Sequence, residues 1–251
     1  MEKASFLGHP SPLLTVMAQA ATAPRAMELM ERGYMGGAEA FGLQFCRMKA
    51  EYKTPETFAS LFAAARGLPV YVTNYRQGEN EQKTDDTLAS EILELAECGA
   101  TLCDVMGDLF DPTVGELTKN PLAVDRQKDL IKRLHAAGAQ VLMSSHVMRF
   151  LPAEQVLEIA LAQQSRGADI CKIVVSSSNL DEQAENMNIL RLLARELEKP
   201  FLFLSIGESR LLRRLGEKLG NCMTLCVCEH DDLATPAQPL LSDMIEIRKL
   251  L

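Results

Sequence analysis

The chain has 251 residues, of which 47% are hydrophobic and 24% charged, with a formal net charge of -8 at pH 7. These values are typical of a soluble globular protein that can bury a sizeable core. Because Lys and Arg form no long blocks, we expect neither nucleic acid nor a membrane surface as a partner. The sequence also lacks an apolar stretch of membrane-spanning length and a secretory signal, so we expect a cytoplasmic protein.

The seven cysteines are scattered and lie mostly in apolar segments. This distribution favours reduced core thiols over disulfides. Cys222, Cys226 and Cys228 form a tighter group, but no histidine lies at zinc-finger spacing. We therefore expect no metal site.

Short apolar or β-branched runs alternate with longer segments of helical period along the chain. The predicted strands are residues 13–18, 38–46, 69–74, 101–106, 140–146, 169–176, 201–206 and 223–228. The predicted helices are residues 23–32, 55–65, 86–98, 125–137, 152–166, 180–197, 209–219 and 242–250. Thr54 is a predicted N-cap, and Gly99 and Gly138 fall just past helix ends, where a left-handed residue is favoured.

Eight strand–helix units in a chain of this length predict a (β/α)₈ barrel, or TIM barrel, as a single domain over residues 1–251. A doubly wound sheet usually has fewer strands and a glycine-rich first turn, which is absent here. In a barrel, functional side chains lie at the C-terminal ends of the strands and in the loops that follow. The longer loops of this kind are residues 77–85 and 107–124.

One lysine interrupts the sixth predicted strand. The run GADICKIVVSS, residues 167–177, places Lys172 on the same side as Ile170 and Val174. If that side is the barrel interior, desolvation disfavours the charged form, and a neutral lysine amine can attack a carbonyl to form a Schiff base. The alternatives are a lysine that reaches solvent or one paired with a carboxylate such as Asp169.

His146 ends the preceding predicted strand, which a parallel barrel places beside the strand of Lys172. A histidine there could remove a proton next to an imine and later protonate a leaving hydroxyl. The alternative is a hydrogen-bonded polar residue at a strand end. Arg76 and Arg214 follow the third and seventh strands, where a guanidinium suits a carboxylate or phosphate, although Arg214 also fits a solvated helix face.

These residues resemble the type I 3-dehydroquinate dehydratases, which are Schiff-base enzymes with a (β/α)₈ barrel. VLMSSH resembles the strand that carries the family's acid–base histidine, and RGADICKIVV resembles its GADIPKIAV strand with the imine lysine. The resemblance implies that His146 and Lys172 are the catalytic residues. VYVTNYRQGENE resembles the family's FTFRxxxEGGE, which assigns Arg76 to the substrate and Glu79, or alternatively Glu81, to the catalytic set as the acidic partner of the histidine.

Two later segments also resemble the family. FLSIGESRLLRRLG is similar to the segment with a carboxylate-binding arginine, which implies Arg214, and ATPAQPL is similar to the SAPGQ loop, which implies Gln238. In that loop Ala234 stands at the place of the serine, unless Thr235 substitutes for it.

The second predicted strand departs from the family. FGLQFCRM offers Gln44 and Cys46 where the family has a Glu-x-Arg pair that contacts ring hydroxyls, and Arg47 is displaced by one position. A shift of one residue along a strand would turn Arg47 to the opposite face. Met106 replaces the family's acidic residue in strand four.

The resemblance implies a dehydratase that eliminates water from 3-dehydroquinate and needs no metal or organic cofactor, since the imine withdraws the electrons. It also implies a homodimer. Two alternatives stay open because of the altered second strand: a related enzyme for another carboxylated β-hydroxy ketone, or a non-catalytic barrel that binds a small acid.

Overall fold

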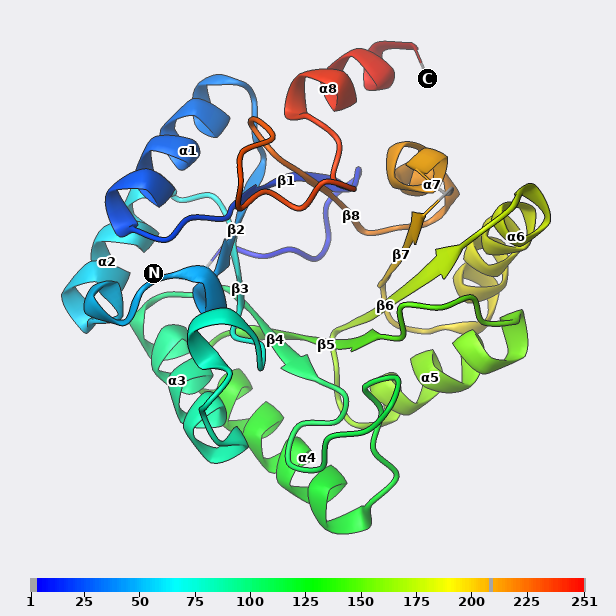
Figure 1. Ribbon diagram of the computed structural model, residues 1–251, viewed down its shortest axis with the longest axis horizontal. Helices are drawn as coiled ribbons and strands as arrows, with labels where there is room; N and C mark the ends of the chain where they lie inside the picture. Colours follow the sequence, from blue (N-terminus) through cyan, green and yellow to red (C-terminus); the bar gives the residue numbers. More distant parts are fainter. Residues whose placement is uncertain (1–3, 208–209, 251) are drawn as a thin grey trace.

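The computed structural model describes residues 4–207 and 210–250. Eight parallel strands form one sheet in the order β7-β6-β5-β4-β3-β2-β1-β8. The strands are β1 Leu13–Ala18, β2 Ala40–Gln44, β3 Val70–Thr73, β4 Leu102–Met106, β5 Gln140–His146, β6 Ile170–Ser177, β7 Phe201–Gly207 and β8 Met223–Cys226. An isolated parallel bridge between Phe201 and Asn221 joins the two edges. The predicted (β/α)₈ barrel is therefore confirmed (Figure 1).

Helices surround the barrel in the alternating order that the sequence predicts (Figure 1). They are α1 Ala23–Met35, α2 Pro55–Ala64, α3 Asp85–Cys98, α4 Pro121–Ala136, α5 Ala153–Ser165, α6 Leu180–Glu196, α7 Arg210–Leu215 and α8 Leu241–Leu250. The Thr54 side chain accepts a hydrogen bond from the Thr57 backbone N, which confirms the predicted N-cap. Within the described residues, no helix is both long and apolar enough to cross a membrane.

Two of the differences from the predicted element boundaries concern the neighbourhood of the cavity. Strand β2 ends at Gln44 because the chain turns into a 3₁₀ helix, Phe45–Arg47. The helix predicted over 209–219 ends earlier: α7 stops at Leu215 and a 3₁₀ turn, Gly216–Leu219, follows. Residue 209 lies outside the described residues.

The interior of the barrel is filled by side chains from alternate strand positions. Ile170 and Val174 belong to this interior cluster, and Lys172 lies between them at 4% exposure. The side that Lys172 shares with Ile170 and Val174 is therefore the barrel interior, and the alternative of a lysine that reaches solvent is wrong. Phe6 is buried in the same cluster, and its backbone N binds the side-chain oxygen of Gln140 at the start of β5. The N-terminal segment thus packs against the end of the barrel opposite the strand C-termini.

Candidate functional site

A cavity of about 430 Å³ lies at the C-terminal ends of the strands. Apolar side chains such as Met17, Leu204 and Leu225 form part of its wall. The polar and charged side chains that line it are Gln19, Gln44, Arg47, Tyr71, Thr73, Tyr75, Arg76, Gln77, Glu116, His146, Lys172, Arg213, Thr235 and Gln238. An apolar wall with a few convergent polar groups is typical of a small-molecule site.

Lys172 is held in a buried polar cluster at this cavity. Its Nζ donates to the hydroxyls of Tyr71 and Tyr75, at 2.9 and 2.7 Å, and lies 3.2 Å from Oδ2 of Asp104. Both tyrosines donate to the same oxygen of Asp104, and Ser144 Oγ donates to the other at 2.5 Å. The ammonium therefore has a partner for each of its three hydrogens.

The carboxylate that pairs with Lys172 is Asp104 and not Asp169. Asp169 lies at the other end of the strand, where it binds Nε2 of His135 and the backbone N of Val141, each at 2.8 Å. Burial, followed by the charge of Asp104, raises the pKa of Tyr71 and Tyr75 well above 10, so both hydroxyls keep their protons. The resting site is thus a buried ion pair bridged by two neutral phenols.

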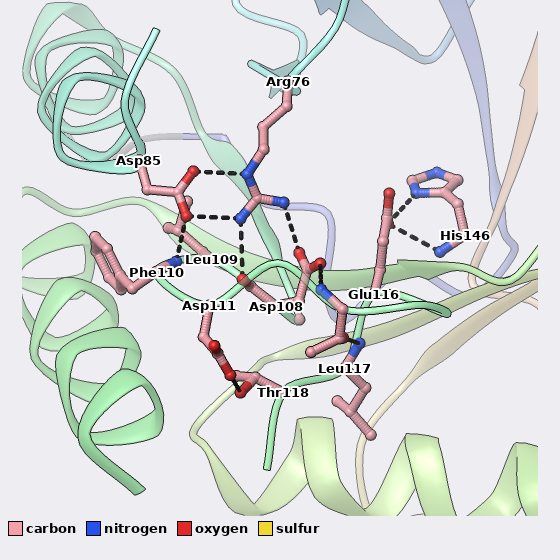
Figure 2. Close-up of polar contacts among 12 residues, drawn as sticks. Arg76, Asp85, Asp108, Leu109, Phe110, Asp111, Glu116, Leu117, Thr118 and His146 are labelled. Atoms are coloured by element: carbon pink, nitrogen blue, oxygen red, sulfur yellow. Dashed lines mark hydrogen bonds and ion pairs between the residues drawn. The ribbon is translucent and has the colours of Figure 1, made fainter. Parts of the chain in front are cut away.

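His146 is positioned by the long loop between β4 and α4. Oε2 of Glu116 accepts hydrogen bonds from Nδ1 of His146 at 2.7 Å and from its backbone N at 2.9 Å (Figure 2). Because a carboxylate only accepts, Nδ1 carries the proton and Nε2 is left as the basic nitrogen. The ring of Tyr75 packs edge-on against the imidazole with centroids 5.1 Å apart.

The assignment of Glu79 or Glu81 as the partner of His146 is wrong in this geometry. Residues 78–80 form a 3₁₀ turn whose inward residue is Asn80, which donates to Asn74 Oδ1 and to the Tyr75 carbonyl. Glu79 and Glu81 on either side are exposed. The inward-facing residue of the turn therefore stabilises the loop itself, and Glu116 is the carboxylate that contacts His146.

Arg76 lines the cavity but is already paired. Its Nε and Nη2 grip Asp85 at 2.6 and 2.7 Å, Nη1 binds Asp108 at 2.8 Å, and Nη2 also donates to the Asp108 carbonyl (Figure 2). Burial alone would lower the pKa of Arg76, but the hydrogen bonds to Asp85 and Asp108 raise it above its usual value. Four of five donors are used, so Arg76 braces the loop and is poorly suited to the substrate carboxylate expected from sequence.

The buried arginine of the site is Arg213 and not Arg214. Arg213 lines the cavity at 7% exposure, and its Nε donates to the Ser205 carbonyl at 3.0 Å. Arg214, one residue on, is half-buried and does not line the cavity. Burial lowers the pKa of Arg213 to about 10, because no carboxylate among the described residues pairs with it. Because burial of the charged guanidinium is energetically unfavourable, binding of an anion beside it would be favourable.

The second strand contributes an arginine despite its altered sequence. Because β2 ends at Gln44, the following 3₁₀ turn brings Arg47 back to the cavity, and Arg47 Nε donates to Gln44 Oε1 at 3.2 Å. The expectation that Arg47 faces away is therefore wrong. Gln19 donates to Gln44 Oε1 and to Thr235 Oγ1, at 2.6 and 2.8 Å, which joins this side to the last loop.

The side-chain oxygens of Gln238 and Thr73 also lie in the wall of the cavity, buried and without a hydrogen-bond partner among the described residues. Buried polar groups are rarely left unsatisfied. Gln238 and Thr235, both expected from sequence at the site, line the same cavity as Arg213, and Thr235 is hydrogen-bonded to Gln19.

Sequence reasoning missed several residues of the site. Gln19 follows directly on β1, and a polar residue at that position after an apolar run was a usable signal. Glu116 lies in an irregular loop with no periodic pattern. Tyr71 lies in β3 and Tyr75 just after it, and only the closed barrel brings them to Lys172.

The arrangement can perform a definite set of steps. It offers one amine, one histidine with a fixed basic nitrogen, and one buried guanidinium in a single cavity. These groups can attack a carbonyl, move a proton and hold an anion. No group of three or more His, Cys, Asp or Glu suited to a metal occurs in residues 4–207 and 210–250.

Comparison with known sequences finds one family. A profile described as type I 3-dehydroquinase matches residues 37–251. The 3-dehydroquinate dehydratase of Aquifex aeolicus (strain VF5) is 27% identical over 149 residues, which are 59% of this chain and 64% of that protein. The alignment thus spans less than two thirds of that relative. The 3-dehydroquinate dehydratase of Klebsiella pneumoniae subsp. pneumoniae is 24% identical over 219 residues, covering 82% of this chain and 79% of that protein.

Solved structures share the fold at low sequence identity. The 3-dehydroquinate dehydratase from Geobacillus kaustophilus HTA426 has a TM-score of 0.83 at 16% identity, covering 97% of this chain and 92% of that one. A type I 3-dehydroquinate dehydratase from Clostridium difficile, solved with covalently modified comenic acid, has a TM-score of 0.81 at 15% identity, covering 97% and 93%. These likenesses establish a common barrel architecture.

Proposed function

Because the chain belongs to the type I 3-dehydroquinase family, we propose that it eliminates water from 3-dehydroquinate through a Schiff base on Lys172. The observation that carries the proposal is that Lys172 and His146 line one cavity from the adjacent strands β6 and β5. Lys172 supplies the amine that captures the ketone, and His146 supplies the base for the neighbouring carbon.

The reaction proceeds by capture and elimination. Nζ of Lys172 attacks the ketone carbon, and the carbonyl oxygen leaves as water to give an imine. The imine withdraws electrons, so Nε2 of His146 can take the α-proton and then return a proton to the β-hydroxyl as it departs. Glu116 holds the ring and stabilises the imidazolium while the proton resides there.

Binding of the substrate divides between two sides of the cavity. Arg213, a buried cation, and the side-chain NH2 of Gln238, a hydrogen-bond donor in the same cavity, hold the carboxylate. The linked side chains of Gln19, Gln44 and Thr235, together with Arg47, receive the ring hydroxyls. Arg76 acts indirectly, by bracing the loop that carries Glu116.

A second candidate function follows from the same hydroxyl side. Gln44 is a neutral amide where the family resemblance expects a glutamate, which would suit a carboxylated β-hydroxy ketone with a different hydroxyl pattern. Purified protein should be assayed by ultraviolet absorbance for the conjugated product of 3-dehydroquinate and of other hydroxy ketones. If the protein turned over another hydroxy ketone but not 3-dehydroquinate, the second candidate function would be supported and the first would be wrong.

The catalytic role of Lys172 is tested by comparing two lysine variants. Lys172→Met should abolish turnover, whereas Lys119→Met, which removes an exposed surface lysine, should leave it intact. If the parent protein binds 3-dehydroquinate but does not turn it over, and Lys172→Met only weakens this binding, the protein is instead a small-acid-binding barrel. A cytoplasmic location and a homodimer remain predictions from sequence.

A further inference from the structure

The proposed function leaves one step unexplained, which is how Lys172 loses its proton. A charged ammonium has no lone pair and cannot attack a carbonyl. The side chains of Lys172 and Asp104 are only 5% and 0% exposed, so bulk water has little access to the pair. Among the described residues, the hydrogen-bond partners of Nζ are Tyr71, Tyr75 and Asp104.

The geometry around Nζ contains a continuous hydrogen-bonded route to Asp104. Tyr75 accepts from Nζ at 2.7 Å and donates to Oδ2 of Asp104 at 2.5 Å, while the direct Nζ–Oδ2 distance is 3.2 Å. His146 and Glu116 also line the cavity, but neither is among the hydrogen-bond partners of Nζ in the described residues. Arg47, Arg76 and Arg213 are cations and have no lone pair that could accept a proton. Asp104 is therefore the base in contact with the lysine.

We propose that Asp104 accepts the proton of Lys172, directly or through the Tyr75 hydroxyl, and later returns it to the departing carbonyl oxygen. This inference rests on the proposed Schiff-base function and deepens it. In the relay, Nζ gives one proton to the Tyr75 oxygen while Tyr75 gives its own to Oδ2. The products are a neutral amine, an unchanged phenol and a carboxylic acid.

The bond-forming, bond-breaking and proton-transfer steps balance without an external co-reactant. The lone pair of Nζ forms the C–N bond, and one proton moves from the nitrogen to the former carbonyl oxygen to give a carbinolamine. Protonated Asp104 then supplies the proton with which that hydroxyl leaves as water. The product is a positively charged imine facing a regenerated Asp104 carboxylate, so the ion pair of the resting state is restored.

The physical setting favours this transfer. Moving one proton converts a buried ion pair into two neutral groups without changing the net charge of the cluster, and neutral groups are the less costly to bury. Tyr71 and Tyr75 have pKa values raised by burial and by the charge of Asp104. They therefore relay a proton and do not hold a negative charge.

The first test uses the unaltered protein. Adduct formation with 3-dehydroquinate is trapped with borohydride at short times and quantified by mass at pH 7.5–9.0, between the ordinary titrations of histidine and lysine at about 6.5 and 10.4. An internal acceptor predicts a rate that changes less than about twofold across this window. A rate that rises about tenfold for each pH unit would show that the proton leaves to solvent, and would overturn the inference.

The second test compares two aspartate variants. Asp104→Asn removes the acceptor and should slow trapping by about a hundredfold, the usual scale of a lost general acid–base group. Asp169→Asn, near the start of the same strand as Lys172 and outside the cavity, is the matched control and should keep the parental rate. If Asp104→Asn fails to fold, the pH profile of the parent protein decides alone.

The outcomes separate this inference from the proposed function. No adduct in the parent protein overturns the Schiff-base function and the inference with it. An adduct that forms equally fast in the folded Asp104→Asn variant preserves the function and overturns the inference alone.

Discussion

One oxygen of Glu116 accepts hydrogen bonds from both the backbone N and the Nδ1 of His146, at 2.9 and 2.7 Å. Glu116 has a φ of 50°, in the left-handed region that non-glycine residues seldom occupy. Its carbonyl is fixed in turn by Ser145 Oγ at 2.7 Å. Backbone strain concentrated at a residue that orients a candidate base is consistent with a functional role.

Glu116→Gln should lower kcat for water elimination by about tenfold to a hundredfold, because a neutral amide does not stabilise the imidazolium. Glu79→Gln and Glu81→Gln are the matched controls, since both side chains are exposed. Steady-state kinetics at saturating 3-dehydroquinate measure the effect. A loss in Glu79→Gln with full activity in Glu116→Gln would restore the partner expected from sequence.

Gly107→Ala should lower both activity and stability. A Cβ there would lie 2.5 Å from the Glu116 carbonyl oxygen and 3.0 Å from Ser145 Oγ, so the loop must move. Overpacking of this kind costs about 1–3 kcal/mol, and the displaced Glu116 would no longer hold His146. The free energy of unfolding, measured in urea, and kcat should both decrease. A fully active variant would mean that catalysis does not depend on the position of this loop.

Arg213→Met should raise KM by about tenfold to a hundredfold, because it removes a charge-assisted contact worth roughly 1.5–3 kcal/mol. The same change should not destabilise the fold, since no carboxylate among the described residues pairs with this buried charge, which is therefore costly to bury. Thermal unfolding and KM are measured together, with Arg214→Met as the neighbouring control. A larger KM effect in Arg214→Met would reverse the assignment.

The pKa of Arg213, lowered by burial to about 10, also predicts a pH effect on binding. Below that value the guanidinium is charged and binds a carboxylate; above it the charge is progressively lost. KM should therefore increase as the pH rises through about 10, and the increase should be absent in Arg213→Met. A KM in the parent protein that stays constant through this range would contradict the assigned role.

Arg76→Ala should destabilise the protein by about 3 kcal/mol, because it leaves the largely buried carboxylates of Asp85 and Asp108 unpaired. Arg126→Ala is a suitable control: Arg126 pairs with exposed Asp86 and is itself 48% exposed, so its loss should cost under about 1 kcal/mol. Denaturant unfolding gives both values. Equal costs would contradict the bracing role of Arg76.

Sequence predicted the barrel and its strands because local periodicity and helix caps are encoded within short windows. It also predicted that Lys172 shares a side with Ile170 and Val174, since strand parity is a local property. It assigned Arg214 instead of Arg213 to the cavity for a geometric reason. Successive residues along a helix point about 100° apart, so an assignment that is wrong by one residue selects a side chain on another face. Arg47 was misplaced because the strand ended before it.

The partners of Lys172 and His146 were beyond sequence reasoning for a different reason. Asp104 reaches Lys172 from two strands away, and Glu116 reaches His146 from an irregular loop. Contacts between distant segments depend on the closed barrel and on loop paths that follow no period. The family resemblance placed a carboxylate near the histidine but could not place it in the right loop.

The most direct test of the central claim is the mass of the peptide that carries Lys172 after borohydride treatment in the presence of 3-dehydroquinate. The proposed mechanism predicts one reduced adduct, located on Lys172 and absent from the Lys172→Met variant. Consumption of 3-dehydroquinate with no adduct at Lys172, or with an adduct on another lysine, would contradict it.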